Sequence, residues 1–312
     1  MLVLLMALAM AACRPQDAAT APAHLSDQPP RIASFSPALS ATVVALGWEN
    51  SLVGRTPWCK STAPIVGSLN DVDLETLARM KPNLILIQQT RSGAPAQLEQ
   101  VAREKGWRIE FIPATSLDDI RHLPTAVERA VAKPAPISPQ LLAQALEKEL
   151  TTCAAAQKLS PTILLYSDEP IGAFGADTYL AQAWNAMGGT LAFFKSGNPN
   201  LSMEELFATQ PKSIIVIVGA VGDKAHAQSH DVLADACAKR GVSLLALYAP
   251  QLLLPGPEFT NGLKLFRSEI QKFCVGQAQA RAQAQALQAP VTSQVGALEV
   301  TADNISQGAN KP

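Results

Sequence analysis

The feature that most constrains the fold is a short pattern that occurs twice, 129 residues apart. Each copy has a segment with apolar residues and a glutamate, then a proline, then a run of large apolar residues. The first copy comprises 74–77, Pro82 and 85–87, and the second comprises 203–206, Pro211 and 214–216. A continuous apolar run is typical of a parallel strand that is buried on both faces. Each copy therefore predicts a short helix, a proline turn and a central strand, and the pair predicts two similar lobes.

Strand and helix signals alternate on both sides of these copies. Residues 31–36 predict a buried strand, and Ser36-Pro37 predicts the N-cap and first residue of a helix that Gly47 ends. The other expected strands are 52–54, 84–87, 107–112, 162–166, 214–218 and 244–247. The other expected helices are 97–105, 117–132, 179–187, 202–209, 232–240 and 261–273. Such alternation is typical of parallel sheets with helices on both faces. The predicted fold class is α/β, with two doubly wound lobes.

A long helical segment lies between the two halves. Proline-rich sequence ends the first half at Pro136, and residues 139–158 predict one helix, about 30 Å long at 1.5 Å per residue. We expect this helix to connect the lobes. The predicted organisation is an export segment and tether at 1–30, an N-terminal lobe at 31–136, the connector helix at 137–160, a C-terminal lobe at 161–275 and a disordered tail or weak helix at 276–312.

The first twelve residues are apolar and too short to span a bilayer. Met10-Ala11-Ala12 precede Cys13, and small residues before a cysteine are typical of a lipoprotein signal, although no positive charge precedes the apolar run. Processing at this point makes Cys13 a lipidated N-terminus. The alternative is an ordinary signal peptide. Both predict a periplasmic protein, and only the first adds a membrane contact, through a lipid anchor at Cys13.

The charge and the remaining cysteines limit the possible functions. The net charge is −1 and there is no run of Lys or Arg, which argues against a nucleic-acid surface. Cys59, Cys153, Cys237 and Cys274 lack the spacing of a metal site, so one or two disulfides are expected in an exported protein, with the three pairings left open. His226 and His230 are four residues apart but lie in polar sequence that predicts a solvated loop.

The candidate ligand contacts follow the predicted strands. In open α/β sheets, ligands bind beyond the carboxyl ends of the strands. Arg55 and Trp58 follow one strand, and Gln88 and Arg91 follow another. Trp58 is either a ligand contact or a cover for the sheet edge. The chain has no GxGxxG, P-loop, GxSxG or HExxH motif, so two such lobes predict a binding protein with its ligand in the cleft, rather than an enzyme.

Several short motifs occur in an order that resembles one family, the substrate-binding proteins of ABC importers for cobalamin, heme or ferric siderophores. The resemblance covers roughly residues 31–273. The motifs are RIASFSP at 31–37, LVG at 52–54, PWC at 57–59, VGS at 66–68, Leu74-Glu75 with MKPNLIL at 80–86, NAMGG at 185–189, and SME at 202–204 with Pro211. Among the members of this family, the cobalamin binders are the most similar.

The resemblance implies a helical-backbone, class III periplasmic binding protein, in which one long rigid helix joins the lobes. It also implies a monomer that works with an ABC permease and its ATPase. The glutamate of each repeat, Glu75 or Glu204, is then expected to dock against arginines of the permease. Favourable placement of each carboxylate at a helix N-terminus is the alternative explanation.

The resemblance matches the ligand pocket of the family only in part. Trp58 and Tyr166 fall on aromatic pocket positions of the cobalamin binders, but three further aromatic positions hold Leu69, Gln88 and Asn198. The complete set of expected ligand contacts is Ser36, Arg55, Trp58, Leu69, Asn70, Gln88, Arg91, Tyr166 and Asn198. A corrinoid is the first expectation. The alternative is a ferric siderophore or heme, whose negative charges suit Arg55 and Arg91.

Two further expectations come from the family. Its C-lobe cysteine pair is incomplete, since Cys274 is present but Met187 occupies the other position, so Cys237 is the expected replacement partner. No resident cofactor or metal site is expected. Other functional hypotheses are a metal- or cluster-binding enzyme on a similar scaffold, and a sensory or structural lipoprotein that binds a peptide.

Overall fold

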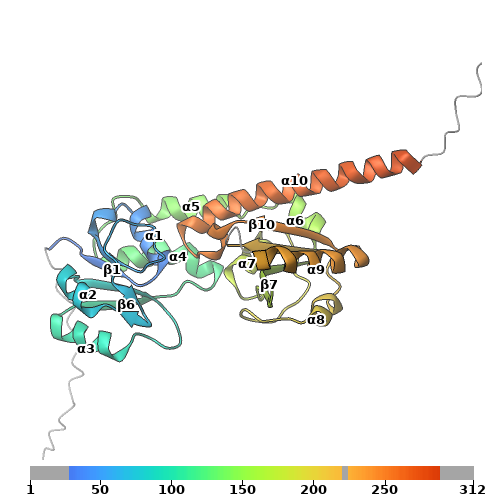
Figure 1. The fold of residues 1–312 in the computed structure, drawn as a ribbon. Helices are drawn as coiled ribbons and strands as arrows, with labels where there is room; N and C mark the ends of the chain where they lie inside the picture. The colour runs from blue at the N-terminus through green and yellow to red at the C-terminus, as the bar shows by residue number, and fades with distance from the viewer. Residues whose placement is uncertain (1–27, 220–223, 289–312) are drawn as a thin grey trace, which may run out of the picture.

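The protein forms two α/β lobes side by side, with helices packed across both of them (Figure 1). The computed structural model describes residues 28–219 and 224–288. Cys13 and the expected export segment lie outside these residues. Within the described part of the chain, none of the helices is long and apolar enough to span a bilayer.

The N-terminal lobe is built on a parallel sheet of four strands in the order β2-β1-β5-β6. These strands are β1 (Ile32–Ser34), β2 (Leu52–Arg55), β5 (Leu84–Gln88) and β6 (Arg108–Ile112). Alternate residues of β5 point to opposite faces. Leu84 and Leu86 pack with α1 (Pro37–Ala45) and α4 (Leu117–Val131), whereas Ile85 and Ile87 pack with α2 (Leu74–Met80) and α3 (Ala96–Lys105). The apolar run is continuous because both faces of the sheet are covered.

The C-terminal lobe repeats this plan with the strand order β10-β9-β7-β8. Its strands are β7 (Thr162–Asp168), β8 (Ile171–Ala173), β9 (Ser213–Val218) and β10 (Ser243–Tyr248), and only β8 is antiparallel. One face packs against α7 (Tyr179–Ala186) and α10 (Pro257–Gln288), and the other against α8 (Met203–Ala208) and α9 (Lys224–Arg240). The short elements η1 (Glu49–Ser51), β3 (Gly67–Ser68), β4 (Asp71–Val72) and η2 (Pro250–Leu253) complete the fold.

The local signals of the sequence match the structure closely at the first helix. Ser36 is the N-cap of α1, where its hydroxyl accepts a hydrogen bond from the Leu39 backbone N–H, and Pro37 is the first helical residue. The two sheets, each covered by helices on both faces, confirm the predicted α/β class with two doubly wound lobes.

The prediction of a single connector helix at 139–158 is wrong. The segment forms two helices, α5 (Pro139–Glu149) and α6 (Ala154–Leu159). The Arg267 guanidinium of α10 binds the carbonyl oxygens of Glu149 and Thr151, and the Cys153 N–H donates to the Met187 carbonyl at 2.8 Å. These tertiary partners replace the hydrogen bonds that would continue the helix.

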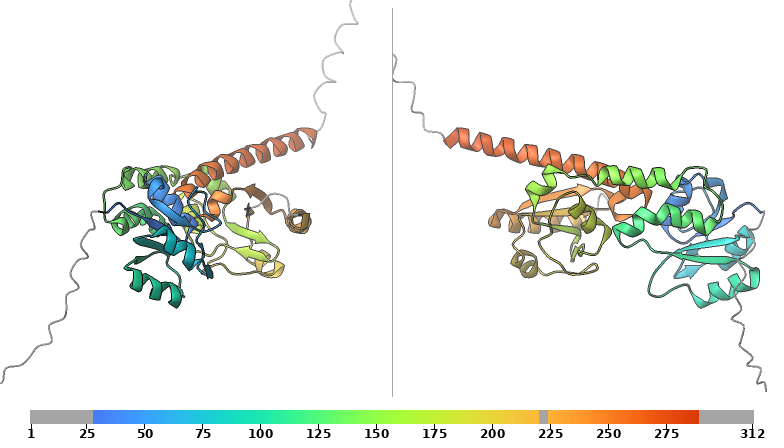
Figure 2. Two further views of the ribbon diagram at one scale, coloured as in Figure 1. Left: turned by 60° about the vertical axis from the view of Figure 1, so that its left-hand side comes forward. Right: turned by 180° about the vertical axis from the view of Figure 1, so that it is seen from behind.

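The helix that reaches both lobes is α10. It is longer than the predicted 261–273 and contacts α1 and α5 as well as α6 (Figures 1 and 2). Of the two expectations for the C-terminal segment, the structure shows helix from 276 to Gln288, because Ala, Gln and Arg are good helix formers and no Pro or Gly interrupts residues 277–288. The α9 helix also begins earlier than predicted, at Lys224, and so includes both His226 and His230.

The expected disulfide between Cys237 and Cys274 is also wrong. Cys237 lies in the core between α9 and the C-lobe sheet, whereas Cys274 packs against the core on the opposite face of that sheet. The sheet therefore separates the two thiols. Cys59, Cys153, Cys237 and Cys274 are all free thiols within the described part of the chain.

Candidate functional site

A cavity of about 730 Å³ lies between the two lobes. We call it the cleft. Its lining residues come from the ends of β5 and β6, from β7 and the loops beside it, and from the segment that follows β10: Gln88, Ala114, Thr115, Tyr166, Phe174, Asp177, Thr178, Tyr179, Gly197, Asn198, Leu253 and Pro255. This is the expected place for a ligand in an open α/β sheet, and the volume falls in the usual range for small-molecule sites.

Aromatic side chains form the C-lobe wall of the cleft. The rings of Tyr166 and Phe174 are 5.5 Å apart and meet edge to face, as do those of Tyr179 and Phe259 at 5.0 Å. A Cβ atom at Gly172 would overlap the Tyr166 ring, so glycine lets this ring approach the backbone of β8 closely. The Tyr166 hydroxyl donates to the Asn198 carbonyl at 3.3 Å. The wall offers flat apolar surface to a ligand.

Tyr179 has a structural role as well as a place in the lining. Its hydroxyl donates to the Leu252 carbonyl at 3.0 Å, and burial raises the pKa of the Tyr179 phenol far above its ordinary value. The phenol therefore stays protonated, and Tyr179 contributes ring surface to the cleft without contributing charge.

Gln88 is one of two polar residues, with Thr115, that the N-terminal lobe presents to the cleft. The Ser36 hydroxyl donates to Gln88 Oε1 at 3.0 Å, and Gln88 Nε2 lies 3.5 Å from the Ala114 carbonyl oxygen. Ser36 itself is only 2% exposed. It therefore lies beneath Gln88 and orients the amide, and it does not line the cavity.

The loop 194–198 forms another part of the C-lobe wall and is held by its neighbours. The Asp177 carboxylate accepts a hydrogen bond of 2.6 Å from the Gly197 N–H, and the Ala176 N–H donates to the Lys195 carbonyl at 2.9 Å. The loop packs so closely on Gly175 that a Cβ atom there would lie 2.5 Å from the Lys195 carbonyl oxygen. These contacts place Asn198 at the cleft.

The described lining of the cleft carries a single charged side chain, the carboxylate of Asp177. No lysine or arginine belongs to that lining. Arg55 donates instead to the carbonyl oxygens of Ala63 at 2.9 Å and Thr56 at 3.0 Å, so it supports the loop after β2. Arg91 is exposed in the loop after β5. The cleft thus offers amides, hydroxyls and aromatic rings, with one negative charge.

The expected ligand contacts are brought together only in part. Gln88, Tyr166 and Asn198 line the cleft, with Ser36 behind Gln88. Trp58 is 68% exposed and lies in a separate cavity of about 200 Å³, between α1 and the start of α10. Leu69 packs partly against the N-lobe core, and Asn70 is exposed in the turn between β3 and β4.

Sequence reasoning missed Thr115, Phe174, Asp177, Thr178 and Tyr179 as cleft residues. The last four follow β8, a three-residue antiparallel strand that is not among the strands expected from the sequence. The only signal was indirect: Thr178 is a good N-cap residue, and its hydroxyl accepts from the Ala181 N–H at the start of α7.

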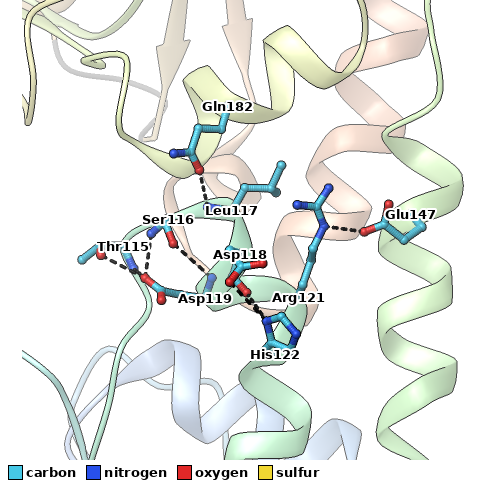
Figure 3. Close-up of polar contacts among 9 residues, drawn as sticks. All are labelled: Thr115, Ser116, Leu117, Asp118, Asp119, Arg121, His122, Glu147 and Gln182. Atoms are coloured by element: carbon cyan, nitrogen blue, oxygen red, sulfur yellow. Dashed lines mark hydrogen bonds and ion pairs between the residues drawn. The ribbon is translucent and has the colours of Figure 1, made fainter.

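Hydrogen bonds join the lobes at one side of the cleft (Figure 3). The Leu117 N–H at the start of α4 donates to Gln182 Oε1 of α7 at 2.7 Å, and the Tyr179 N–H donates to the Thr115 carbonyl at 3.1 Å. Ser116 and Asp119 form a capping box there. In the same region, Arg121 Nε lies 2.6 Å from Glu147 Oε1, which ties α4 to α5. These contacts fix the separation of the lobes on this side.

The two repeated glutamates occupy corresponding places in the lobes. Glu75 lies in the first turn of α2 and Glu204 in the first turn of α8, and both are exposed. Neither carboxylate forms a hydrogen bond or ion pair with the described residues. Glu205, in contrast, caps α8 and pairs with Lys195 at 3.1 Å. Glu75 and Glu204 are therefore available to an external partner.

The described residues contain no group of three or more His, Cys, Asp or Glu side chains that could hold a metal ion. The arrangement also lacks a base paired with a nucleophile among the residues that line the cleft. To a ligand, the cleft offers ring surface and neutral hydrogen-bonding groups beside the carboxylate of Asp177.

No family model matches the sequence, and no curated protein matches it either. Solved structures, however, share its fold. The periplasmic heme-binding protein RhuT of Roseiflexus is 22% identical, with a TM-score of 0.56 over 78% of this chain and 98% of that one. A periplasmic heme-binding protein of Pseudomonas aeruginosa is 23% identical, with a TM-score of 0.56 over 78% and 93%.

The periplasmic vitamin B12-binding protein BtuF of Vibrio cholerae is 20% identical, with a TM-score of 0.53 over 77% of this chain and 96% of that one. The similarity thus extends over nearly the whole length of each solved chain. This chain has the fold of the class III periplasmic binding proteins.

Proposed function

We propose that this chain is the solute-binding component of an ABC importer, which captures a metal chelate in the cleft and delivers it to a permease. The observation that carries the proposal is a cavity of ligand size, about 730 Å³, that both lobes line at the carboxyl edges of their sheets. The solved proteins with this fold that bind heme or vitamin B12 support the same class of ligand.

The charge of the cleft favours a corrinoid within this class. The propionates of heme and the ligand groups of many ferric siderophores are anionic, and cations are their natural partners. Here the single charge of the described lining is the carboxylate of Asp177. Neutral amide groups, such as those around a corrinoid ring, can pair with Gln88, Thr115 and Asn198. Heme or a ferric siderophore is the alternative ligand.

Titration calorimetry with the purified full chain tests the ligand. We expect one-to-one binding of cyanocobalamin, weakened at least tenfold by Tyr166→Ala, because removal of a buried aromatic contact costs about 1.5–3 kcal/mol. Leu141→Ala, which shortens an exposed apolar side chain of α5, is the control and should leave binding unchanged. Binding of hemin with no heat from cyanocobalamin would select the alternative. Absence of binding by corrinoid, hemin and ferric siderophore alike would refute the function.

The same titration with Trp58→Ala defines how far the ligand extends. Trp58 is a proposed contact but lies outside the cleft cavity. Unchanged binding would assign Trp58 to the edge of the lobe. Weaker binding would mean that the ligand reaches past the cavity to α1.

The partners and location belong to the same proposal. Exposed Glu75 and Glu204, one per lobe, are proposed to pair with arginines of the permease. Reversal of both charges, with Glu99→Lys and Glu104→Lys on α3 as the matched control, should abolish ligand delivery to the permease while leaving ligand binding intact. Retained transport by the Glu75→Lys, Glu204→Lys variant would refute docking through these residues. Export to the periplasm as a monomer, with Cys13 as a lipid anchor, completes the proposal.

A further inference from the structure

A second cavity, of about 650 Å³, lies at the opposite edge of the N-lobe sheet from the cleft. We call it the basal pocket. It is formed where β1, β5 and β6 begin and where α4 ends. Its lining includes five basic residues: Arg31, Lys81, Lys105, Arg108 and Lys133. Among the described residues that line it, there is no Asp or Glu. The pocket therefore combines a concave shape with one sign of charge.

The fold leaves most of this positive charge without a counter-ion. Arg31 donates to the carbonyl oxygens of Lys81 at 2.9 Å and Met80 at 2.5 Å, and Lys133 donates to the Gln28 carbonyl at 2.8 Å. Carbonyl oxygens satisfy these donors but do not cancel their charge. Lys81 and Lys105 are exposed, and their ammonium groups form no hydrogen bond or ion pair with the described residues.

A carboxylate does approach one of the five cations. Glu110 Oε1 lies 3.2 Å from Arg108 Nε, although Glu110 does not line the pocket. The geometry of this ion pair is too poor for a hydrogen bond, and Arg108 Nε is buried without a hydrogen-bond partner in the described structure. Even with this pair counted as neutral, four positive charges remain around the pocket.

Stabilisation of helix ends explains only part of this charge. The helices α2, α3 and α4 all end at the basal pocket, and cations are favourable near helix C-termini. The C-terminal lobe provides an internal comparison. Its corresponding edge has a cavity of about 380 Å³ that only two basic residues line, Lys158 and Lys212.

That cavity is also partly covered by α10, whose Gln277 side chain donates to Ser243 Oγ at 2.9 Å. The basal pocket of the N-terminal lobe is larger and more basic than its counterpart.

The turn chemistry does not require lysine at position 81. Lys81 ends α2 with a φ of 48°, and Gln210, which occupies the matching place in the second repeat, has a φ of 53°. Glutamine is therefore compatible with this left-handed turn in the same fold. The lysine is available for another role.

We propose that the basal pocket binds a compact anion that carries phosphate groups. Lysine ammonium groups attract phosphate as point charges, and arginine adds planar paired donors. The cations come from separate segments of the chain and surround a hollow, which suits a small soluble polyanion better than a flat membrane surface. The site is independent of the cleft, because the two lie at opposite edges of the N-lobe sheet.

Calorimetric titration of the full chain with pyrophosphate at low ionic strength tests this site. We expect one-to-one binding that the double variant Lys81→Gln, Lys105→Gln weakens about tenfold, as expected for loss of two partly screened charge contacts. The matched control is Lys158→Gln, Lys212→Gln, which removes the same charge from the counterpart cavity. It should retain the binding of the unmodified protein.

Three outcomes would overturn the proposal. Equal weakening by both double variants would mean general attraction to a positive surface. No binding of pyrophosphate at millimolar concentration would mean that the pocket holds no phosphate ligand. Lysine-dependent binding to vesicles of anionic phospholipid, without binding of pyrophosphate, would mean that the face meets a membrane surface instead. Cyanocobalamin titrated into the same variants reports separately on the cleft.

Discussion

The side-chain oxygen of Gln182 accepts a hydrogen bond of 2.7 Å from the backbone N–H of Leu117, and this bond joins the two lobes. Leu117 is the first residue of α4 in the N-terminal lobe, and Gln182 lies on α7 in the C-terminal lobe (Figure 3). The Leu117 residue is 3% exposed, so water cannot easily replace Gln182 as the acceptor.

We therefore expect Gln182→Ala to lower the free energy of unfolding by about 1–2 kcal/mol, because it leaves a buried donor unpaired. Urea denaturation followed by circular dichroism measures this change. Gln100→Ala is the control, since Gln100 is exposed and donates only to Glu104 on the same helix. A Gln182 variant as stable as the control variant would show that the interlobe bond is unimportant.

Asp119, at the N-terminus of α4, should make the free energy of unfolding of the protein depend on pH. Burial alone would raise its pKa, but hydrogen bonds from Ser116 and Thr115 outweigh burial and hold the pKa of Asp119 below 3.8. A carboxyl group with a lowered folded pKa stabilises the protein above pH 3.8, and this contribution disappears as the pH falls through the folded pKa.

Asp119→Asn should therefore cost up to about 1 kcal/mol at pH 7, a value limited by solvent screening of a partly exposed group. The difference in unfolding free energy between the two proteins should shrink as the pH falls below 3.8. Denaturation curves at several pH values between 7 and 2 measure it. A difference that stays constant over this range would contradict the assigned role of the carboxylate.

Gly175 should be intolerant of a side chain because the loop 194–198 packs directly on it. A Cβ atom there would overlap the backbone oxygen atoms of Gly197 and Lys195, which cannot move without the loop. We expect Gly175→Ala to cost about 2 kcal/mol through overpacking and to weaken cleft binding, because Asn198 moves with the loop.

Gly276→Ala is the matched control, since nothing lies within 4 Å of the added atom. Gly276 lies inside α10, so alanine should stabilise the protein slightly, by up to about 1 kcal/mol. Thermal denaturation and ligand titration of both variants test the pair. Normal binding by Gly175→Ala would mean that the loop position does not matter to the ligand.

Cys237 should be unreactive in the native protein. Burial raises the pKa of its thiol to about 11, so only roughly one molecule in a thousand carries the thiolate at pH 8. Iodoacetamide at pH 8, followed by peptide mass spectrometry, should leave Cys237 unmodified in the folded protein and modify it fully in guanidinium chloride. Rapid modification in the folded state would show that the α9 side of the lobe opens readily.

The sequence alone determined the two-lobed α/β architecture, because its signals are local. An apolar run such as 84–87 indicates a strand with two covered faces, and Ser36-Pro37 indicates a helix start, whatever lies nearby in space. The duplicated Glu75 and Glu204 were likewise visible as a repeat, and the structure places both in first helical turns.

Only the tertiary structure decided where helices break and which side chains meet. The segment 139–158 has helical character throughout, but Arg267, 118 residues from Glu149, stabilises the break between α5 and α6. In the same way, the sheet between Cys237 and Cys274 excludes a disulfide that the spacing allowed.

The cleft shows the same limit. Gln88 and Tyr166 were accessible to sequence reasoning because each lies in or at the end of a strand with a clear pattern. Asp177 and Tyr179 were not, since they reach the cleft through a short antiparallel strand and a glycine-dependent loop contact. Trp58 was expected to contact the ligand because it follows a predicted strand, but it lines a separate cavity. Local sequence sets the elements, whereas contacts between distant residues set the site.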